Sequence, residues 1–133
     1  MVLDYIPDGM LPKWMLIVST AAFFNSAQCF ISPFKFNREI YSLQTSEVTC
    51  LSARLFGVWT LLSGIVRLHC TYNIHDRTAY IMAMATYAIA LFHFSTELLI
   101  FKTVKLNRAS LGPFIVSTFS LTWMIISYSK YVS

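Results

Sequence analysis

The chain has 133 residues, of which 56% are hydrophobic and only 12% are charged, and its mean hydropathy is +0.60. A soluble globular domain normally carries about 25% charged residues. This composition excludes an ordinary soluble domain and predicts a single all-α membrane domain over residues 1–133.

Four apolar stretches are long enough to cross a hydrocarbon core of about 30 Å, which takes about 20 helical residues. We expect transmembrane helices at residues 14–31, 48–72, 78–101 and 111–128. Pro33 is expected to end the first helix, and Gly112-Pro113 to begin the fourth with Ser110 as its cap. The sequence therefore predicts a bundle of four transmembrane helices.

The connecting segments indicate an orientation, because cytosolic loops tend to carry the basic residues. The first connecting segment (32–47) and the third (102–110) lie at the same end of a four-helix bundle. The basic residues of these two segments are Lys35, Arg38, Lys102, Lys105 and Arg108. Fewer basic residues flank the helices at the opposite end. We therefore expect the first and third segments in the cytosol and both termini in the lumen.

Rows of small residues predict close packing of the helices. Gly57 and Gly64 share one ridge of the second helix with Arg54 and Leu61. Small side chains in such rows let helix backbones approach closely within lipid. Similar rows occur in the first and fourth helices, at Ser19, Ala22, Ser26, Ser117, Ser120 and Ser127. A compact bundle is the expected result.

The third helix carries a stripe of small and polar residues at spacings of three and four. Its members are Ala83, Thr86, Ala90, His93 and Glu97. Residues three and four apart share one face of a helix. We therefore expect this stripe to face the interior of the bundle.

Charged side chains at bilayer depth should face the interior or find a partner. If the second and third helices form a hairpin, Arg54 and Glu97 lie at similar depth, and we predict an ion pair between them. His93 would lie one turn deeper. Arg67 is near the opposite end of its helix, so we expect its guanidinium to extend to the headgroup layer there.

The pair formed by His93 and Glu97 has two interpretations. The first is a structural clamp between two helices, in which the carboxylate is accounted for by an arginine. The second is a proton-transferring pair in an enzyme or a transporter. Proton chemistry needs an additional polar path, which favours the clamp.

Several kinds of chemistry are not indicated. The three histidines form no HxxxH or HxxH pair, and the four glycines compose no phosphate-binding loop. We expect no catalytic residues, no metal and no cofactor. The basic residues are spread over the loops, which predicts contact with anionic lipid headgroups rather than with nucleic acid. Lys102, Lys105 and Arg108 are the candidate headgroup patch, although a simple topology signal is the favoured interpretation of these three residues.

Several stretches resemble the ergosterol biosynthetic protein twenty-eight family of small endoplasmic-reticulum membrane proteins. They are LSARLFGVWTLLSGIVR (51–67), ALFHFSTELLIF (90–101) with the following Lys102, and GPFIVSTFSLTWM (112–124). LPKWMLIVS (11–19) looks like the fungal branch of that family. The residues that fall together in order are Arg54, Gly57, Trp59, Thr60, Arg67, His93 and Glu97.

The resemblance implies a multi-pass scaffold of the endoplasmic reticulum without catalytic activity of its own. Its implied partners are the C-4 methyl sterol oxidase, the decarboxylating sterol C-3 dehydrogenase and the 3-keto-sterol reductase, with sterol C-24 methyltransferase as a further associate. Arg54, His93 and Glu97 would then fix the second and third helices. Trp59 would either contact a partner or pack in the core. The small-residue rows would also permit a homodimer.

Two other functions stay open at this point. A small sterol isomerase would use Glu97 and His93 to move protons on a bound sterol, and a cavity should then open around His93. A small transporter would use the same pair. Against a transporter, the expected helices of this chain are not interrupted by glycine and proline in the way that transport sites tend to use.

Overall fold

A computed structural model of the chain describes residue 7 and residues 9–132. These residues form helices and connecting segments and contain no β-strand, which confirms the all-α class. The elements are α1 (Met10–Ile31), α2 (Pro33–Ile40), the 3-10 turn η2 (Thr45–Glu47), α3 (Cys50–Tyr72), α4 (Arg77–Leu99), α5 (Arg108–Ile126) and α6 (Tyr128–Tyr131).

Four helices, α1, α3, α4 and α5, are long and apolar enough to cross a membrane, as the sequence predicts. The fourth begins earlier than expected. Asn107 caps α5 by accepting hydrogen bonds from the backbone of Ala109 and Ser110, and the Ser110 side chain closes a capping box. The prediction that Ser110 is the cap is therefore wrong, and Pro113 lies within α5.

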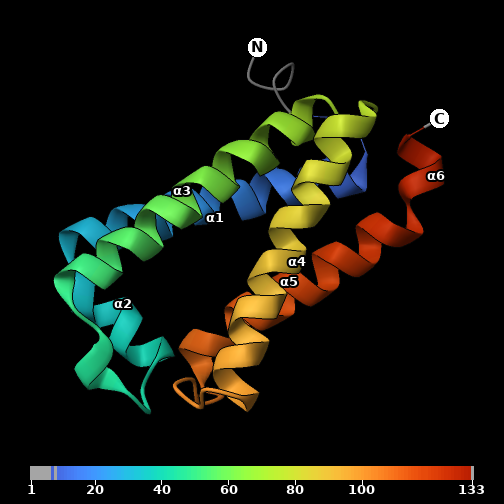
Figure 1. Cartoon of the computed structure of the whole chain (residues 1–133). Coiled ribbons are helices and arrows are strands. Elements are labelled where there is room, and N and C mark those ends of the chain that lie inside the picture. The colour runs from blue at the N-terminus through green and yellow to red at the C-terminus, as the bar shows by residue number, and fades with distance from the viewer. Residues whose placement is uncertain (1–6, 8, 133) are drawn as a thin grey trace.

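The long helices form two pairs (Figure 1). One pair is α1 with α3, and the other is α4 with α5. The pairs meet where α3 passes into α4 and diverge toward α2, which lies at the opposite end of the molecule (Figure 1). The second and third transmembrane helices, α3 and α4, are thus neighbours near their turn and separate away from it.

Two glycines allow α1 and α3 to pack closely. A Cβ atom added to Gly57 would lie 2.9 Å from the Cβ of Cys29, and one added to Gly64 would lie 3.3 Å from the Cβ of Ala22. The hydroxyl of Ser26 also donates to the Gly57 carbonyl at 2.8 Å. The expected close approach is confirmed for the glycines.

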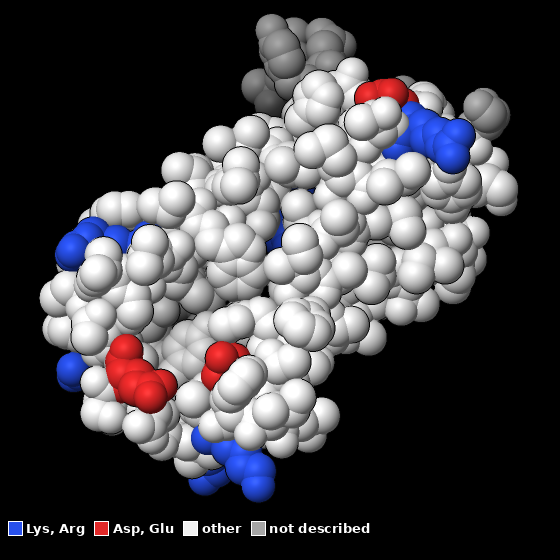
Figure 2. All heavy atoms as spheres, viewed as in Figure 1, with Lys and Arg blue, Asp and Glu red and all other residues white. Residues whose placement is uncertain are grey.

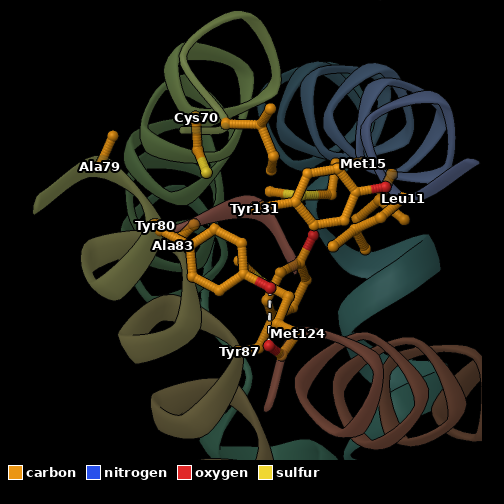
Figure 3. Close-up of a cluster of buried hydrophobic side chains, with 11 residues drawn as sticks. Leu11, Met15, Cys70, Ala79, Tyr80, Ala83, Tyr87, Met124 and Tyr131 are labelled. Atoms are coloured by element: carbon orange, nitrogen blue, oxygen red, sulfur yellow. Dashed lines mark hydrogen bonds between the residues drawn. The ribbon is translucent and has the colours of Figure 1, made fainter. Parts of the chain in front are cut away.

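The end near the α3–α4 turn holds the larger hydrophobic core (Figure 3). The Tyr80 hydroxyl in this core donates to the carbonyl of Met124 at 2.6 Å, which joins α4 to α5. His75 in the turn lies 2.7 Å from the Tyr131 carbonyl through its Nδ1. The core side chains labelled in the figure are Leu11, Met15, Cys70, Ala79, Tyr80, Ala83, Tyr87, Met124 and Tyr131.

The first connecting segment is a folded element. Pro33 ends α1 as expected, and it also begins α2, whose Asn37 and Ile40 are buried. The backbone N–H of Leu43 donates to the Thr103 carbonyl at 3.1 Å, and the Asn107 side chain donates to the Glu39 carbonyl at 2.8 Å. The first and third connecting segments therefore lie together at one end of the bundle.

Candidate functional site

An aromatic cluster bridges the two helix pairs where they diverge. Neighbouring ring centroids in it lie 5.0 to 6.3 Å apart, the separation typical of stacked and edge-to-face aromatic pairs. The residues come from α2, α3, α4 and α5 and from Tyr41, which directly follows α2. The members of this aromatic cluster are Phe36, Tyr41, Phe56, Trp59, His93, Phe94 and Phe114.

His93 is held in this cluster by Tyr41. The Tyr41 hydroxyl lies 2.6 Å from His93 Nε2, and the Trp59 ring packs edge-on against the imidazole at 5.3 Å. Burial raises the pKa of Tyr41, and the negative charge of Glu97 raises it further. The phenol is therefore protonated and can donate to an unprotonated Nε2.

Glu97 is bonded to the third connecting segment. Its carboxylate accepts a hydrogen bond from the Thr103 hydroxyl at 2.5 Å, and its backbone carbonyl accepts from the Thr103 N–H at 2.9 Å. His93 and Glu97 are both half-buried on the inward face of α4, as predicted. Each is thus engaged by a different connecting segment.

The predicted ion pair between Arg54 and Glu97 is wrong. Arg54 is exposed on α3, and no ion pair joins these two described residues. Matching depth was not sufficient, because Gly57 and Gly64 direct one face of α3 toward α1 and the helix pairs separate at this end. Arg54 and Leu61 are exposed although they share the predicted ridge with the glycines.

Arg67 also departs from its prediction. It does not extend to a headgroup layer but is only 8% exposed. Its Nε donates to the Thr86 hydroxyl at 2.9 Å, and its guanidinium carbon lies 4.1 Å from the centroid of the Tyr87 ring. The reason is that α3 and α4 are still close near their turn, so the side chain is enclosed between them. Thr86 belongs to the stripe that was predicted to face inward.

Two pockets open beside the aromatic cluster. The first, of about 370 Å³, lies at the α2 end and is lined by Tyr41, His93 and Glu97. Acidic side chains lie on either side of a hollow at this end (Figure 2). The second, of about 350 Å³, lies between the helix pairs and is lined by Arg67, Arg108 and mostly apolar or small side chains. Trp59 lines both pockets, so it packs in the cluster and also contributes to these surfaces.

Some residues at this site could not be found from the sequence. Tyr41 and Thr103 hold His93 and Glu97, yet they lie in connecting segments without periodicity. Only the folding back of α2 brings Tyr41 to α4. Among the described residues, no group of three His, Cys, Asp or Glu side chains gathers in a way that could hold a metal ion.

Known proteins resemble the chain along nearly its whole length. Residues 11–122 match the family model described as Erg28 like protein. Ergosterol biosynthetic protein 28 of Schizosaccharomyces pombe is 44% identical over 123 residues, which cover 92% of this chain and 89% of that protein. The protein of the same name in Saccharomyces cerevisiae is 42% identical over 119 residues, covering 90% of this chain and 80% of that protein.

A human relative is also found. Ergosterol biosynthetic protein 28 homolog of Homo sapiens is 34% identical over 118 residues, covering 89% of this chain and 84% of that protein. No solved structure matches the chain. The relatives are named as biosynthetic proteins of the ergosterol pathway. The match to the family model and the identity to these relatives, together with the four long apolar helices, establish that the chain belongs to the Erg28-like protein family.

Proposed function

We propose that this chain is a non-catalytic scaffold that holds sterol biosynthesis enzymes together in the endoplasmic-reticulum membrane. Its membership in the Erg28-like family carries the proposal. The enzymes to be tethered are the C-4 methyl sterol oxidase, the decarboxylating sterol C-3 dehydrogenase and the 3-keto-sterol reductase, with sterol C-24 methyltransferase as an associate. Tethering such enzymes raises the local concentration at which each meets the product of the one before it.

The contacts of His93 and Glu97 support a structural role for both. Tyr41 bonds to the imidazole, and Thr103 bonds to the carboxylate. These two bonds fix the first and third connecting segments to α4. We assign His93, Glu97 and Trp59 to a clamp that keeps this end of the molecule in one conformation. Gly57 and Gly64 hold α1 against α3 in the same framework.

The end clamped in this way offers the partner-binding surface. Helix α2 presents the exposed side chains of Lys35, Arg38 and Glu39, while its Asn37 and Ile40 are buried beneath them. A rigid surface loses less conformational entropy when a partner binds. The neighbouring cations Lys102, Lys105 and Arg108 are exposed and suit contact with anionic lipid headgroups.

The proposal is tested by the sterols of cells that lack this protein. Precursors that still carry C-4 methyl groups should accumulate, because enzymes that are no longer tethered exchange their intermediates poorly. Expression of the native chain should restore the normal sterol profile. Normal levels of these precursors without the protein would contradict the proposal.

A second candidate function has one observation in its favour. The pocket of about 370 Å³ that is lined by His93, Glu97 and Tyr41 is the cavity expected of a small sterol isomerase. In such an enzyme the carboxylate and the imidazole would move protons on a bound sterol. The test is to supply sterols with differently placed double bonds to the purified protein in lipid nanodiscs. Turnover that Glu97→Gln abolishes would establish the isomerase and reject the scaffold.

A further inference from the structure

The pocket between the two helix pairs contains one buried cation. Arg67 lies at one end of this pocket, the exposed Arg108 also lines it, and the remaining walls are apolar, small or uncharged polar side chains. We propose that the pocket binds a sterol precursor that bears a carboxylate, with the carboxylate on Arg67 and the ring system along the apolar walls. This inference rests on the proposed function, for which it names the ligand class that the scaffold itself would hold.

The contacts of Arg67 leave part of its guanidinium free to bind a ligand. One face of the group stacks on the Tyr87 ring at 4.1 Å, and Nε is bonded to Thr86 at 2.9 Å. Among the described residues, the two terminal nitrogens have no hydrogen-bond partner, and the Arg67 side chain lines the pocket. These two nitrogens form the end-on fork that matches the two oxygens of a carboxylate.

The position of this cation calls for an anionic partner. Only 8% of the surface of Arg67 is exposed, and none of its contacts with the described residues is with a carboxylate. An arginine without a counter-charge is costly in a transmembrane helix. Arg67 lies five residues before the last residue of α3, so about 7 to 8 Å along the helix axis separate it from that end of the helix. A bound carboxylate there would offset the cost of burial.

The walls of the pocket suit a flat and rigid body. From Arg67 back to Phe56 the pocket follows α3 for about 16 Å at ~1.5 Å per residue. The aromatic rings of Trp14, Phe56, Trp59 and Phe94 line it, together with small residues such as Gly112. Its volume of about 350 Å³ is within the range of small-molecule sites.

A sterol acid is favoured over a fatty acid for two reasons. A fused ring system loses little conformational freedom on binding, whereas an acyl chain must be ordered at each bond. The proposed partners also require such a compound. A methyl carbon can leave as carbon dioxide only after it has been oxidised to a carboxylate, so the oxidase must pass a sterol acid to the decarboxylating dehydrogenase. A scaffold that retains this acid would keep it between the two enzymes.

The test uses photoreactive sterols and the full-length protein in phosphatidylcholine nanodiscs. One probe carries a carboxylate at carbon 4 and a diazirine in the side chain, and the matched probe carries a methyl group at carbon 4 instead. Photoreactive palmitate serves as the flexible carboxylate. The native chain should be labelled by the sterol acid at least tenfold more than by the methyl sterol, since a charge-assisted hydrogen bond in a dry site supports about that ratio.

Two pairs of variants test the geometry. Arg67→Gln should lower labelling by the sterol acid to the level of the methyl sterol, whereas Arg54→Gln, an exposed arginine on the same helix, should not change it. Gly112→Phe should block both sterol probes, because Gly112 lines the pocket and a Cβ placed there meets no atom within 4 Å, which leaves space for a phenyl ring that would compete with the sterol. Ile115→Phe, on the exposed face of α5, is the matched control.

Some results would overturn this inference. One is equal labelling of the native chain by the two sterols, and another is undiminished labelling of a folded Gly112→Phe variant. Palmitate labelling as strong as that of the sterol acid and equally dependent on Arg67 would reject a sterol and indicate a general site for lipid acids. A native chain that co-purifies with the sterol enzymes but takes up no probe would reject only this inference. A chain that takes up the sterol acid but leaves sterol profiles unchanged when absent would reject the proposed scaffold instead.

Discussion

At the scale of single residues, the site depends on which segment holds each polar group. Sequence periodicity was sufficient to predict that His93 and Glu97 share the inward face of α4. It was not sufficient to identify their partners, because depth along a helix says nothing about which way a neighbouring helix is rotated. Arg54 lies at a suitable depth but on the exposed side of α3, and the actual partners are Tyr41 and Thr103.

The bond between Tyr41 and His93 should contribute measurably to stability. Tyr41→Phe keeps the ring in the aromatic cluster but removes the hydroxyl that lies 2.6 Å from Nε2. We expect the free energy of unfolding to fall by about 1 kcal/mol. Thermal unfolding in detergent micelles measures this loss. Tyr128→Phe is the control, since among the described residues the Tyr128 hydroxyl has no hydrogen-bond partner and the ring packs on Tyr80. Equal effects of the two substitutions would contradict a specific role of the bond.

Substitutions of Glu97 separate the contribution of its hydrogen bond to Thr103 from that of its charge. Glu97→Gln retains an oxygen that can accept from Thr103, so we expect it to lower the free energy of unfolding by less than about 1 kcal/mol. Glu97→Ala removes the acceptor and should cost about 1 to 3 kcal/mol. Both values can be measured by the same unfolding assay. If the two variants were equally unstable, the charge of Glu97 rather than its bond to Thr103 would be what matters.

At the scale of elements, composition and apolar length were sufficient to predict the four long helices, and Pro33 marked the end of the first. Helix α2 could not be predicted in the same way, because it has only eight residues and its stability comes from packing against α1, α3 and α5. Arg67 was misplaced for a related reason. Whether a long side chain leaves a bundle or is enclosed by it depends on how far the neighbouring helices have diverged, and no local pattern encodes that.

Packing of α1 on α3 should be sensitive to a single methyl group. The Cβ of Gly57→Ala would lie 2.9 Å from the Cβ of Cys29, so the two helices would have to separate. We expect a loss of about 1 to 3 kcal/mol in the free energy of unfolding. Gly112→Ala is the matched control, because its Cβ would meet nothing within 4 Å, and it should leave stability unchanged or raise it by about 0.5 to 1 kcal/mol. Equal stability of the two variants would contradict the packing described for α1 and α3.

At the scale of the whole molecule, the two ends of the bundle are held together by different contacts. The first and third connecting segments are joined by hydrogen bonds at one end, and the α3–α4 turn and α6 are joined by His75 at the other. Charged side chains gather mainly toward the two ends, with a largely uncharged surface between them (Figure 2). This arrangement suits a protein that crosses the bilayer with both ends in contact with headgroups.

The orientation expected from the basic residues can be measured by cysteine accessibility. Cys50 is exposed, so it is first replaced by serine. Lys105→Cys should then react with an impermeant maleimide added to sealed microsomes, because the third connecting segment is expected in the cytosol. Asn73→Cys, in the α3–α4 turn, should react only after the membrane is permeabilised. The reverse pattern would show that the orientation is inverted.

The central claim is that this chain assembles enzymes through the surface presented by α2. The direct measurement is co-purification of the tagged chain from gently solubilised microsomes, with the recovered proteins identified by mass spectrometry. The native chain should recover the C-4 methyl sterol oxidase, the decarboxylating dehydrogenase and the 3-keto-sterol reductase. The double variant Lys35→Glu with Arg38→Glu should lose at least one of them, while Arg77→Glu with Lys130→Glu, exposed at the other end, should retain all three. A native chain recovered without these enzymes would contradict the account.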